Sequence, residues 1–251
     1  MNFELKQVPP RSAKPRSAGV TMAMDKGLSV REAEDFISVA GAYTDLIKLG
    51  WATSYVTGDL DRKIAVYQQA GIPFYFGGTL FEAFLIRNQL DDYKRLMEKH
   101  KVGFVEISDG SIDMEEQDKL KYIREFAQNF TVLSEVGSKD ANKVLAPYQW
   151  VEKMKQELEA GAWKVITEAR EGGNVGVFQS SGEVKGGLIE EILHNIPKEK
   201  ILWEAPKKEQ QVFFIKALGN EVNLGNISPN EVIPLETLRL GLRGDTFHLF
   251  L

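Results

Sequence analysis

The sequence predicts an α/β protein, a single-domain (β/α)8 TIM barrel preceded by a short irregular N-terminal extension. Eight short apolar runs recur at intervals of roughly 20 to 35 residues, and amphipathic stretches with helical spacing lie between most of them. The length of 251 residues also suits this fold, because such barrels typically have about 250 residues. An open doubly wound sheet is the alternative, but it would usually need fewer strands.

Each predicted strand has a short apolar core rich in β-branched, aromatic or leucine side chains. Such runs, spaced by helical segments, are typical of buried parallel strands. The eight strands are expected within residues 19–24, 45–50, 73–78, 103–108, 131–137, 163–169, 200–205 and 221–226.

The segments between the apolar runs carry apolar residues three and four positions apart, which is the spacing of one helix face. For example, Leu120, Ile123 and Phe126 recur at this spacing. The predicted helices cover residues 30–43, 81–100, 114–129, 146–162, 187–196 and 207–220.

Residues 1–18 are expected to form the extension, and residues 19–251 the catalytic barrel. The extension contains three prolines and shows no periodicity, which is typical of irregular chain. It is interpreted either as a loosely attached segment or as an arm that reaches a neighbouring subunit.

The composition excludes several classes of protein. A net charge of −5 argues against a nucleic-acid-binding protein, which needs a basic face. The chain has no cysteine, so disulfides, thiolate metal sites and a cysteine nucleophile are excluded. No apolar run approaches the length of a membrane span. We therefore expect a soluble cytoplasmic protein with no membrane or nucleic-acid partner.

Charged residues cluster where the predicted strands end. In a (β/α)8 barrel the active site forms at the C-terminal ends of the strands, and charges facing the barrel mouth are costly unless they are paired or bind a ligand. The acidic residues at these ends are Asp25, Glu106, Glu135, Glu168 and Glu204, and the basic residues are Lys26, Lys48, Lys139 and Arg170.

This combination of charges indicates the chemistry of the site. Carboxylates without thiolates or a clear histidine ligand are typical of Mg2+ sites. A ring of lysine and arginine favours an anionic substrate, for example one with a phosphate. Because the three histidines are interpreted as structural or surface residues, acid–base catalysis is expected from Lys or Glu.

Nine segments of the chain, in order, resemble the phosphosulfolactate synthase family. The resemblance covers nearly the whole chain after about residue 18. The segments are DKGL (25–28), KLGWATS (48–54), GGTLFE (77–82), EISDGS (106–111), EVGSK (135–139), EARE (168–171), EAPKKEQQ (204–211), VNLGNI (222–227) and LETLRLGLRGDTF (235–247).

The resemblance implies a (β/α)8 lyase that adds sulfite to phosphoenolpyruvate, with Mg2+, to give (2R)-2-O-phospho-3-sulfolactate. In methanogens this reaction is the first step towards coenzyme M. The family's proposed general acid matches Lys139, and Glu135 would help to set up the metal or orient a partner. The family pattern has two adjacent lysines at this point, and the first is Ser138 here.

The remaining polar residues at the strand ends are candidates for substrate and metal binding, and the sequence leaves open which carboxylates bind the metal and which form salt bridges. The expected substrate-binding residues are Lys26, Lys48, Arg170, Ser108 and Asn226, and the expected metal-binding residues are Glu106, Glu168, Glu204 and Asp25. A homo-oligomer is expected from the family precedent and the proline-containing extension.

Two other functions remain open. A Schiff-base aldolase-type barrel would use Lys48 or Lys139 as its nucleophile and would need no metal. A barrel that has lost catalysis would bind phosphoenolpyruvate without converting it. The sequence also leaves open whether the product feeds coenzyme M or another sulfonate.

Overall fold

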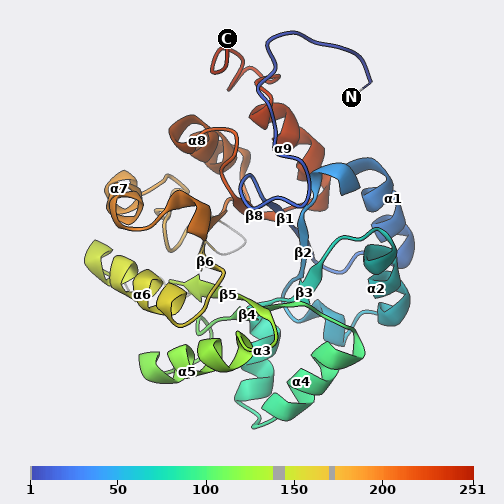
Figure 1. Cartoon of the computed structure of the whole chain (residues 1–251), viewed down its shortest axis with the longest axis vertical. Coiled ribbons are helices and arrows are strands. Elements are labelled where there is room, and N and C mark those ends of the chain that lie inside the picture. The colour runs from blue at the N-terminus through green and yellow to red at the C-terminus, as the bar shows by residue number, and fades with distance from the viewer. Residues whose placement is uncertain (1, 138–144, 170–172) are drawn as a thin grey trace.

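The computed structural model describes residues 2–137, 145–169 and 173–251. Within these residues, eight parallel strands alternate with helices and form a nearly closed barrel, which confirms the predicted (β/α)8 fold (Figure 1). The strands are β1 (Thr21–Asp25), β2 (Leu46–Leu49), β3 (Phe74–Phe76), β4 (Phe104–Ile107), β5 (Thr131–Val136), β6 (Lys164–Thr167), β7 (Ile201–Glu204) and β8 (Leu224–Ile227).

The helices surround the strands as an outer layer (Figure 1). They are α1 (Val30–Ala40), α2 (Leu60–Gln69), α3 (Gly78–Leu85), α4 (Leu90–Lys99), α5 (Glu116–Phe126), α6 (Pro147–Glu159), α7 (Gly186–Asn195), α8 (Lys208–Leu218) and α9 (Val232–Arg239). Short 3-10 helices occupy Gly41–Tyr43, Thr53–Tyr55, Lys198–Lys200 and Pro229–Glu231.

The hydrogen-bonded order of the strands is β3-β2-β1-β8-β7-β6-β5-β4. β3 and β4 stand at the two ends of this order and lie in contact across the remaining seam. Because all the strands are parallel, their C-terminal ends meet at one end of the barrel, and the N-terminal ends meet at the other.

Each predicted strand corresponds to an observed one, but the predicted helix over 81–100 is wrong. The structure has two helices there, α3 and α4, separated at residues 86–89. Asn88 has φ of 55°, a left-handed conformation that cannot continue a right-handed helix. The prediction also missed α2, whose buried face includes a charged residue, Lys63.

Local signals explain where some elements begin. At the start of α1, the Ser29 hydroxyl accepts a hydrogen bond from the backbone N–H of Glu32, and the Glu32 carboxylate accepts one from the Ser29 N–H. This capping box satisfies two N–H groups that have no partner within the helix.

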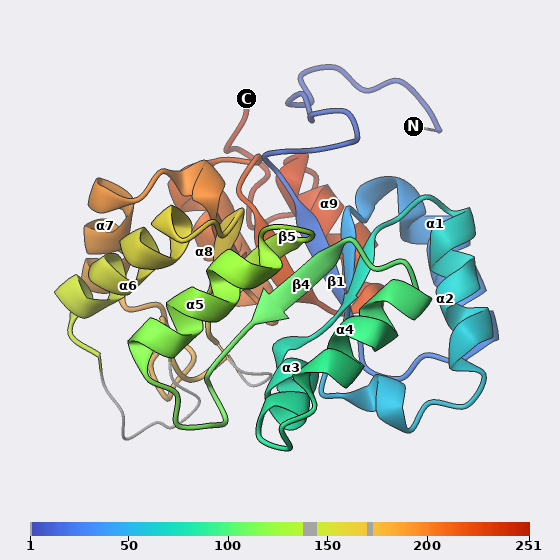
Figure 2. The ribbon, with the colours of Figure 1, turned by 60° about the horizontal axis from the view of Figure 1, so that its bottom comes forward.

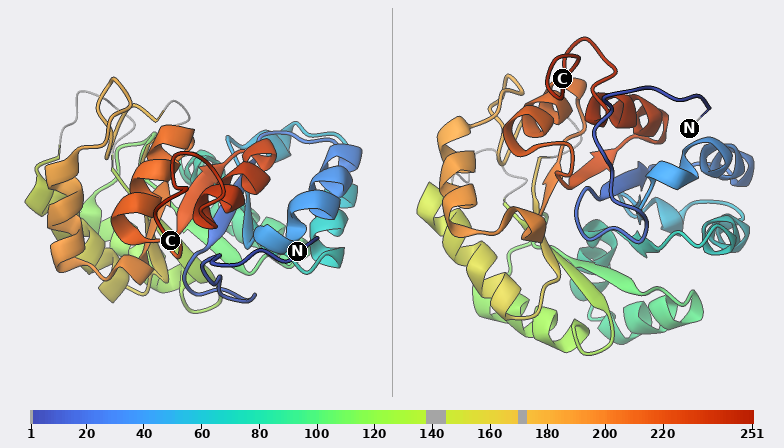
Figure 3. Two further views of the ribbon diagram at one scale, coloured as in Figure 1. Left: turned by 90° about the horizontal axis from the view of Figure 1, so that it is seen from above. Right: turned by 45° about the horizontal axis from the view of Figure 1, so that its top comes forward.

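The N-terminal segment lies across the end of the barrel where the strands begin (Figures 2 and 3). The Arg11 guanidinium contacts the carboxylates of Glu221 and Glu236 at 2.9 and 3.0 Å. Arg16 contacts Asp45 at 2.9 Å. These ion pairs attach an irregular segment to the barrel and leave the opposite end, with the C-terminal ends of the strands, uncovered by it.

No helix in the described part of the chain is long and apolar enough to cross a membrane.

Candidate active site

Buried carboxylates from separate strands meet at the C-terminal end of the barrel. Glu106 lies in β4, Glu135 in β5 and Glu204 at the end of β7. Their exposed fractions are 1%, 3% and 1%. Three carboxylates cannot remain charged at such burial without compensation, and Lys48 of β2 supplies it.

The Lys48 ammonium lies among these three carboxylates. Its Nζ atom is 3.0 Å from Oε2 of Glu106, 3.4 Å from Oε1 of Glu204 and 3.8 Å from Oε2 of Glu135. Three different roles are predicted from the sequence for these four residues: metal binding for Glu106 and Glu204, substrate binding for Lys48 and catalysis for Glu135. The structure brings them into one cluster, which we call the Lys48 cluster (Lys48, Glu106, Glu135 and Glu204).

The charges in the Lys48 cluster alter one another's protonation. Burial disfavours the ammonium form of Lys48, but Glu106, Glu204 and Glu135 outweigh this effect and raise its pKa. Burial raises the pKa of Glu204 to about 7, with Lys48 acting in the opposite direction. Lys48 is therefore a cation near neutral pH, and a charged amine is a poor Schiff-base nucleophile.

Glu106 is held in place by two neighbours from β3 and α3. The Tyr75 hydroxyl donates to Oε2 of Glu106 at 3.0 Å, and the Gly78 backbone N–H donates to Oε1 at 2.7 Å. Burial and the neighbouring Glu106 raise the pKa of Tyr75, so its hydroxyl keeps the proton that it donates. Both carboxylate oxygens of Glu106 thus have a fixed direction.

The sequence Gly77-Gly78 permits this close packing. A Cβ atom on Gly78 would lie 2.1 Å from Oγ of Ser108 and 2.8 Å from Oε1 of Glu106. A Cβ atom on Gly77 would lie 3.1 Å from Cε of Lys48. The two glycines therefore allow β3 and the start of α3 to approach the charged side chains.

Asp25, at the end of β1, is engaged within the protein. Its Oδ1 accepts hydrogen bonds from the N–H groups of Gly27 and Leu28, each at 2.7 Å. Its Oδ2 accepts from the Tyr67 hydroxyl at 2.8 Å and contacts Lys63 Nζ at 2.8 Å. A metal ion at Asp25 would have to displace these donors, so the observed contacts favour a role in shaping the turn after β1.

The other described residues of the predicted site also lie at the strand ends. Glu168 directly follows β6 and is 1% exposed. Asn226, in β8, has φ of 55°, and no donor among the described residues reaches its buried Oδ1. Ser108 directly follows β4, and its hydroxyl donates to the buried carboxylate of Glu82. Lys26 is exposed, with Nζ 4.8 Å from the centre of the Trp51 ring.

Two predicted residues, Lys139 and Arg170, lie outside the described residues, so their predicted roles stay predictions. Ser138 lies outside them as well.

The donor chemistry of the Lys48 cluster fits Mg2+, because carboxylate oxygens are the ligands that this ion prefers. Three carboxylates around one ammonium also leave an excess of negative charge whenever Glu204 is ionised. Within residues 2–137, 145–169 and 173–251, no group of three or more His, Asp or Glu side chains is arranged around a common point as metal ligands. The role of Glu106, Glu168, Glu204 and Asp25 in metal binding stays a prediction.

Four residues that support the site were not predicted from the sequence: Lys63, Tyr75, Glu82 and Lys119. Lys63 and Lys119 fall at helical spacing from buried apolar residues, namely Tyr67 for Lys63 and Ile123 for Lys119. A lysine on the apolar face of a helix is a sequence signal of a buried ion pair. Tyr75 and Glu82 sit within apolar runs, where only the fold reveals their partners.

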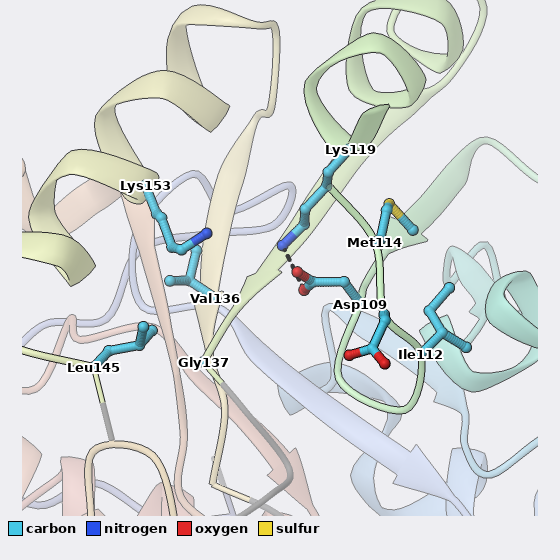
Figure 4. Close-up of a pocket in the computed structure, with 9 residues that line it drawn as sticks. Asp109, Ile112, Met114, Lys119, Val136, Gly137, Leu145 and Lys153 are labelled. Carbon is cyan, nitrogen blue, oxygen red and sulfur yellow. Dashed lines mark hydrogen bonds and ion pairs between the residues drawn. The ribbon is translucent and has the colours of Figure 1, made fainter. Parts of the chain in front are cut away.

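A cavity of about 170 Å3 borders the ends of β4 and β5 (Figure 4). The residues that line it include Asp109, Lys119, Gly137 and Lys153. In Figure 4 the Lys119 side chain points from α5 toward Asp109, and Nζ contacts Oδ1 at 3.0 Å.

A model of the (2R)-phospho-3-sulfolactate synthase (ComA) family matches residues 9–245. The chain belongs to the phosphosulfolactate synthase family. Phosphosulfolactate synthase of Bacillus subtilis (strain 168) is 41% identical over 252 residues, which cover 99% of this chain and 100% of that protein. The Methanocaldococcus jannaschii phosphosulfolactate synthase is 44% identical over 240 residues, 91% of this chain and 94% of its own. The chain is thus similar to phosphosulfolactate synthases along almost its entire length.

Solved structures share the barrel with this phosphosulfolactate synthase family member. The 3-hexulose-6-phosphate synthase of Salmonella typhimurium has a TM-score of 0.56 at 16% identity and covers 89% of this chain and 100% of its own. A phosphonopyruvate hydrolase solved with oxalate and Mg++ has a TM-score of 0.54 at 12% identity, with 86% and 77% covered. At these identities the likeness concerns the fold alone.

Proposed function

We propose that this phosphosulfolactate synthase family member is a lyase that adds sulfite to phosphoenolpyruvate, in a Mg2+-dependent reaction, to form (2R)-2-O-phospho-3-sulfolactate. Membership of the phosphosulfolactate synthase family supports the identity of the proposed product. The observation that carries the proposal is the Lys48 cluster, because buried charge of both signs at the catalytic end of a (β/α)8 barrel suits a reaction between anions.

The proposed reaction forms one carbon–sulfur bond. The sulfur lone pair of sulfite attacks the methylene carbon of phosphoenolpyruvate, and the electrons of the C=C bond move toward C2 and the carboxylate. A proton then reaches C2 and completes the product. Lys139 is the proposed general acid for this step, and Glu135 is proposed to orient groups around it.

Positive side chains are also needed to offset the repulsion between the two substrates, because sulfite and phosphoenolpyruvate are both anions. Lys26 is exposed at the barrel mouth and suits the attraction of anions from solvent. Lys48 and Arg170 are proposed to counter the substrate's negative charge, whereas Ser108 and Asn226 are proposed to hydrogen-bond it. Asn226 would donate from its side-chain NH2 group, because an anion accepts hydrogen bonds and the amide oxygen can only accept them.

Mg2+ is proposed to bind through the carboxylates of Glu106, Glu168 and Glu204. Asp25 is the weakest candidate, because it lies outside the Lys48 cluster and its carboxylate already contacts four donors. When bound, Mg2+ would stabilise the negative charge that develops on the substrate carboxylate. Isothermal titration calorimetry of the chelator-treated protein with Mg2+ tests this binding separately from turnover. Glu204→Gln should weaken it, and undetectable binding to the wild type would contradict the metal proposal.

The proposed partners are thus two small anions, phosphoenolpyruvate and sulfite. We also propose a cytoplasmic homo-oligomer, in line with the extension interpreted from the sequence. Whether the product feeds coenzyme M or another sulfonate is a question about the enzymes that consume it.

The deciding experiment is anaerobic incubation of the protein with phosphoenolpyruvate, sulfite and Mg2+, followed by 31P NMR. The wild type should give a new phosphomonoester signal that EDTA abolishes. Lys48→Met should reduce the rate by about 100-fold or more, because it leaves three buried carboxylates without their shared cation. Lys164→Met is the matched control, since Lys164 is buried at the opposite end of the barrel.

The outcomes separate the alternatives. Tight binding of phosphoenolpyruvate without product would indicate the non-catalytic barrel. Metal-independent turnover that borohydride inactivates in the presence of a carbonyl substrate would indicate the Schiff-base enzyme.

A further inference from the structure

We infer that Lys119 is a positioning residue that fixes the C-terminal end of β5, and with it Glu135, by completing the hydrogen-bond ladder where β4 has ended. The inference rests on the proposed function, because it assigns Lys119 a task in that same site. Lys119 lies in α5, outside the barrel wall, and is 2% exposed.

The backbone of β5 extends past its neighbour β4. The register pairs Ile107, the last residue of β4, with Ser134, so Glu135 and Val136 have no partner residue in β4. Successive backbone carbonyls of a strand point alternately toward its two neighbouring strands. The carbonyls of Val132 and Val136 accept from the N–H groups of Trp163 and Glu168, the residues directly before and after β6. The carbonyl of Glu135 therefore points toward the β4 side.

The Lys119 ammonium occupies the donor position that β4 no longer provides. Its Nζ donates to the Glu135 carbonyl oxygen at 2.6 Å. An unpaired buried carbonyl would cost free energy, so this contact supports the strand end from outside the barrel. The Glu135 side chain points the other way, into the Lys48 cluster, where its Oε2 lies 3.8 Å from Lys48.

The ammonium has three donors and meets three acceptors. Besides the Glu135 carbonyl, Nζ contacts Oδ1 of Asp109 at 3.0 Å and Oε1 of Glu157 at 2.9 Å. Asp109 belongs to the loop after β4, and the fully buried Glu157 belongs to α6. Lys119 therefore joins the β4 loop, the β5 end and α6 beside the cavity of Figure 4.

This geometry makes Lys119 more than a buried ion pair. An ion pair between α5 and α6 would need only Glu157. Lys119 also contacts Asp109 in the loop after β4 and the backbone of Glu135 at the end of β5. Removal of the ammonium should release the Glu135 backbone, and small displacements of reacting groups lower rates strongly.

The test compares Lys119→Met with Lys164→Met. The Lys164 ammonium also donates to two backbone carbonyls, those of Ser17 and Glu199, but at the N-terminal end of the barrel. Both variants should lose stability. Only Lys119→Met should speed amide hydrogen exchange in residues 131–137 and lower kcat by about 10- to 100-fold.

A double variant separates positioning from stability. Lys119→Met leaves the Glu157 carboxylate buried without its cation, and Lys119→Met/Glu157→Leu removes both charges. The double variant should regain thermal stability but keep the low kcat and the fast exchange. Recovery of kcat along with stability would overturn the inference, as would normal exchange in residues 131–137 of Lys119→Met.

Failure of the proposed function would look different. In that case the wild type itself forms no product from sulfite and phosphoenolpyruvate, whereas the exchange comparison between Lys119→Met and Lys164→Met still decides whether Lys119 anchors the end of β5.

Discussion

At the scale of single residues, the site depends on close contacts between buried charges and backbone. Glu106 shows this best, because its two oxygens are fixed by Tyr75, Gly78 and Lys48. A buried carboxylate with such partners is oriented as well as neutralised. Its neighbour Ser108 is held in turn by Glu82, whose second oxygen accepts the Ser111 N–H at 3.1 Å. Small changes in side-chain volume here should affect activity more than stability.

Gly78→Ala should lower kcat/KM by about 100-fold, since the new methyl group would overlap Oγ of Ser108 and push on Glu106. Steady-state kinetics with sulfite and phosphoenolpyruvate would measure this. Gly187→Ala is the control. It lies in α7 with open space around the added Cβ, so it should keep full activity and stabilise the helix by up to about 1 kcal/mol. Equal kinetics for the two variants would contradict the steric argument.

At the scale of elements, several strands and helices have a charged side chain on the face that packs into the core. β6 begins with Lys164, whose ammonium lies 4.4 Å from the centre of the Trp163 ring and donates to the carbonyls of Ser17 and Glu199. Through its hydrogen bond to the Ser17 carbonyl, Lys164 joins the N-terminal segment to the start of β6. Burial, and secondarily the neighbouring Lys200, lowers the pKa of Lys164 to about 8.

The lowered pKa predicts a dependence of stability on pH. Between about pH 8 and pH 10 the unfolded chain keeps the Lys164 proton, whereas the folded protein loses it, so the free energy of unfolding should rise with pH. Urea unfolding of the wild type and Lys164→Met at pH 7 and pH 10 isolates the effect. The difference between the two proteins should change by about 1–2 kcal/mol in favour of the wild type. A pH-independent difference would show that the lysine titrates normally.

At the scale of the whole molecule, the two ends of the barrel have different tasks. The C-terminal end carries the Lys48 cluster, and the N-terminal end carries the irregular segment with Arg11, Arg16 and their carboxylate partners. This division is expected for (β/α)8 enzymes, in which one face serves catalysis and the other stability.

Arg11→Ala should therefore lower the free energy of unfolding by about 2–4 kcal/mol, because it leaves the partly buried carboxylates of Glu221 and Glu236 without their cation. Its kcat should equal that of the wild type, as measured by unfolding and kinetics on the same samples. Arg95→Ala is the control. Arg95 pairs with Asp92 on the surface of α4, and its loss should cost less than about 1 kcal/mol. A strong fall in kcat for Arg11→Ala would contradict the separation of the two ends.

The sequence by itself determined the barrel, because eight apolar runs with helical segments between them leave few ways to bury their surfaces. It also placed Glu106, Glu135, Glu204 and Lys48 in or at the ends of predicted strands, since each apolar run is a local feature and a (β/α)8 barrel brings the C-terminal strand ends to one face. Which charges meet is not a local property. Only the tertiary structure decided that Lys48 lies among three glutamates, that Asp25 is engaged by Lys63 and Tyr67, and that Lys119 reaches β5. These contacts join residues 16 to 156 positions apart, and the closure of the barrel brings them together.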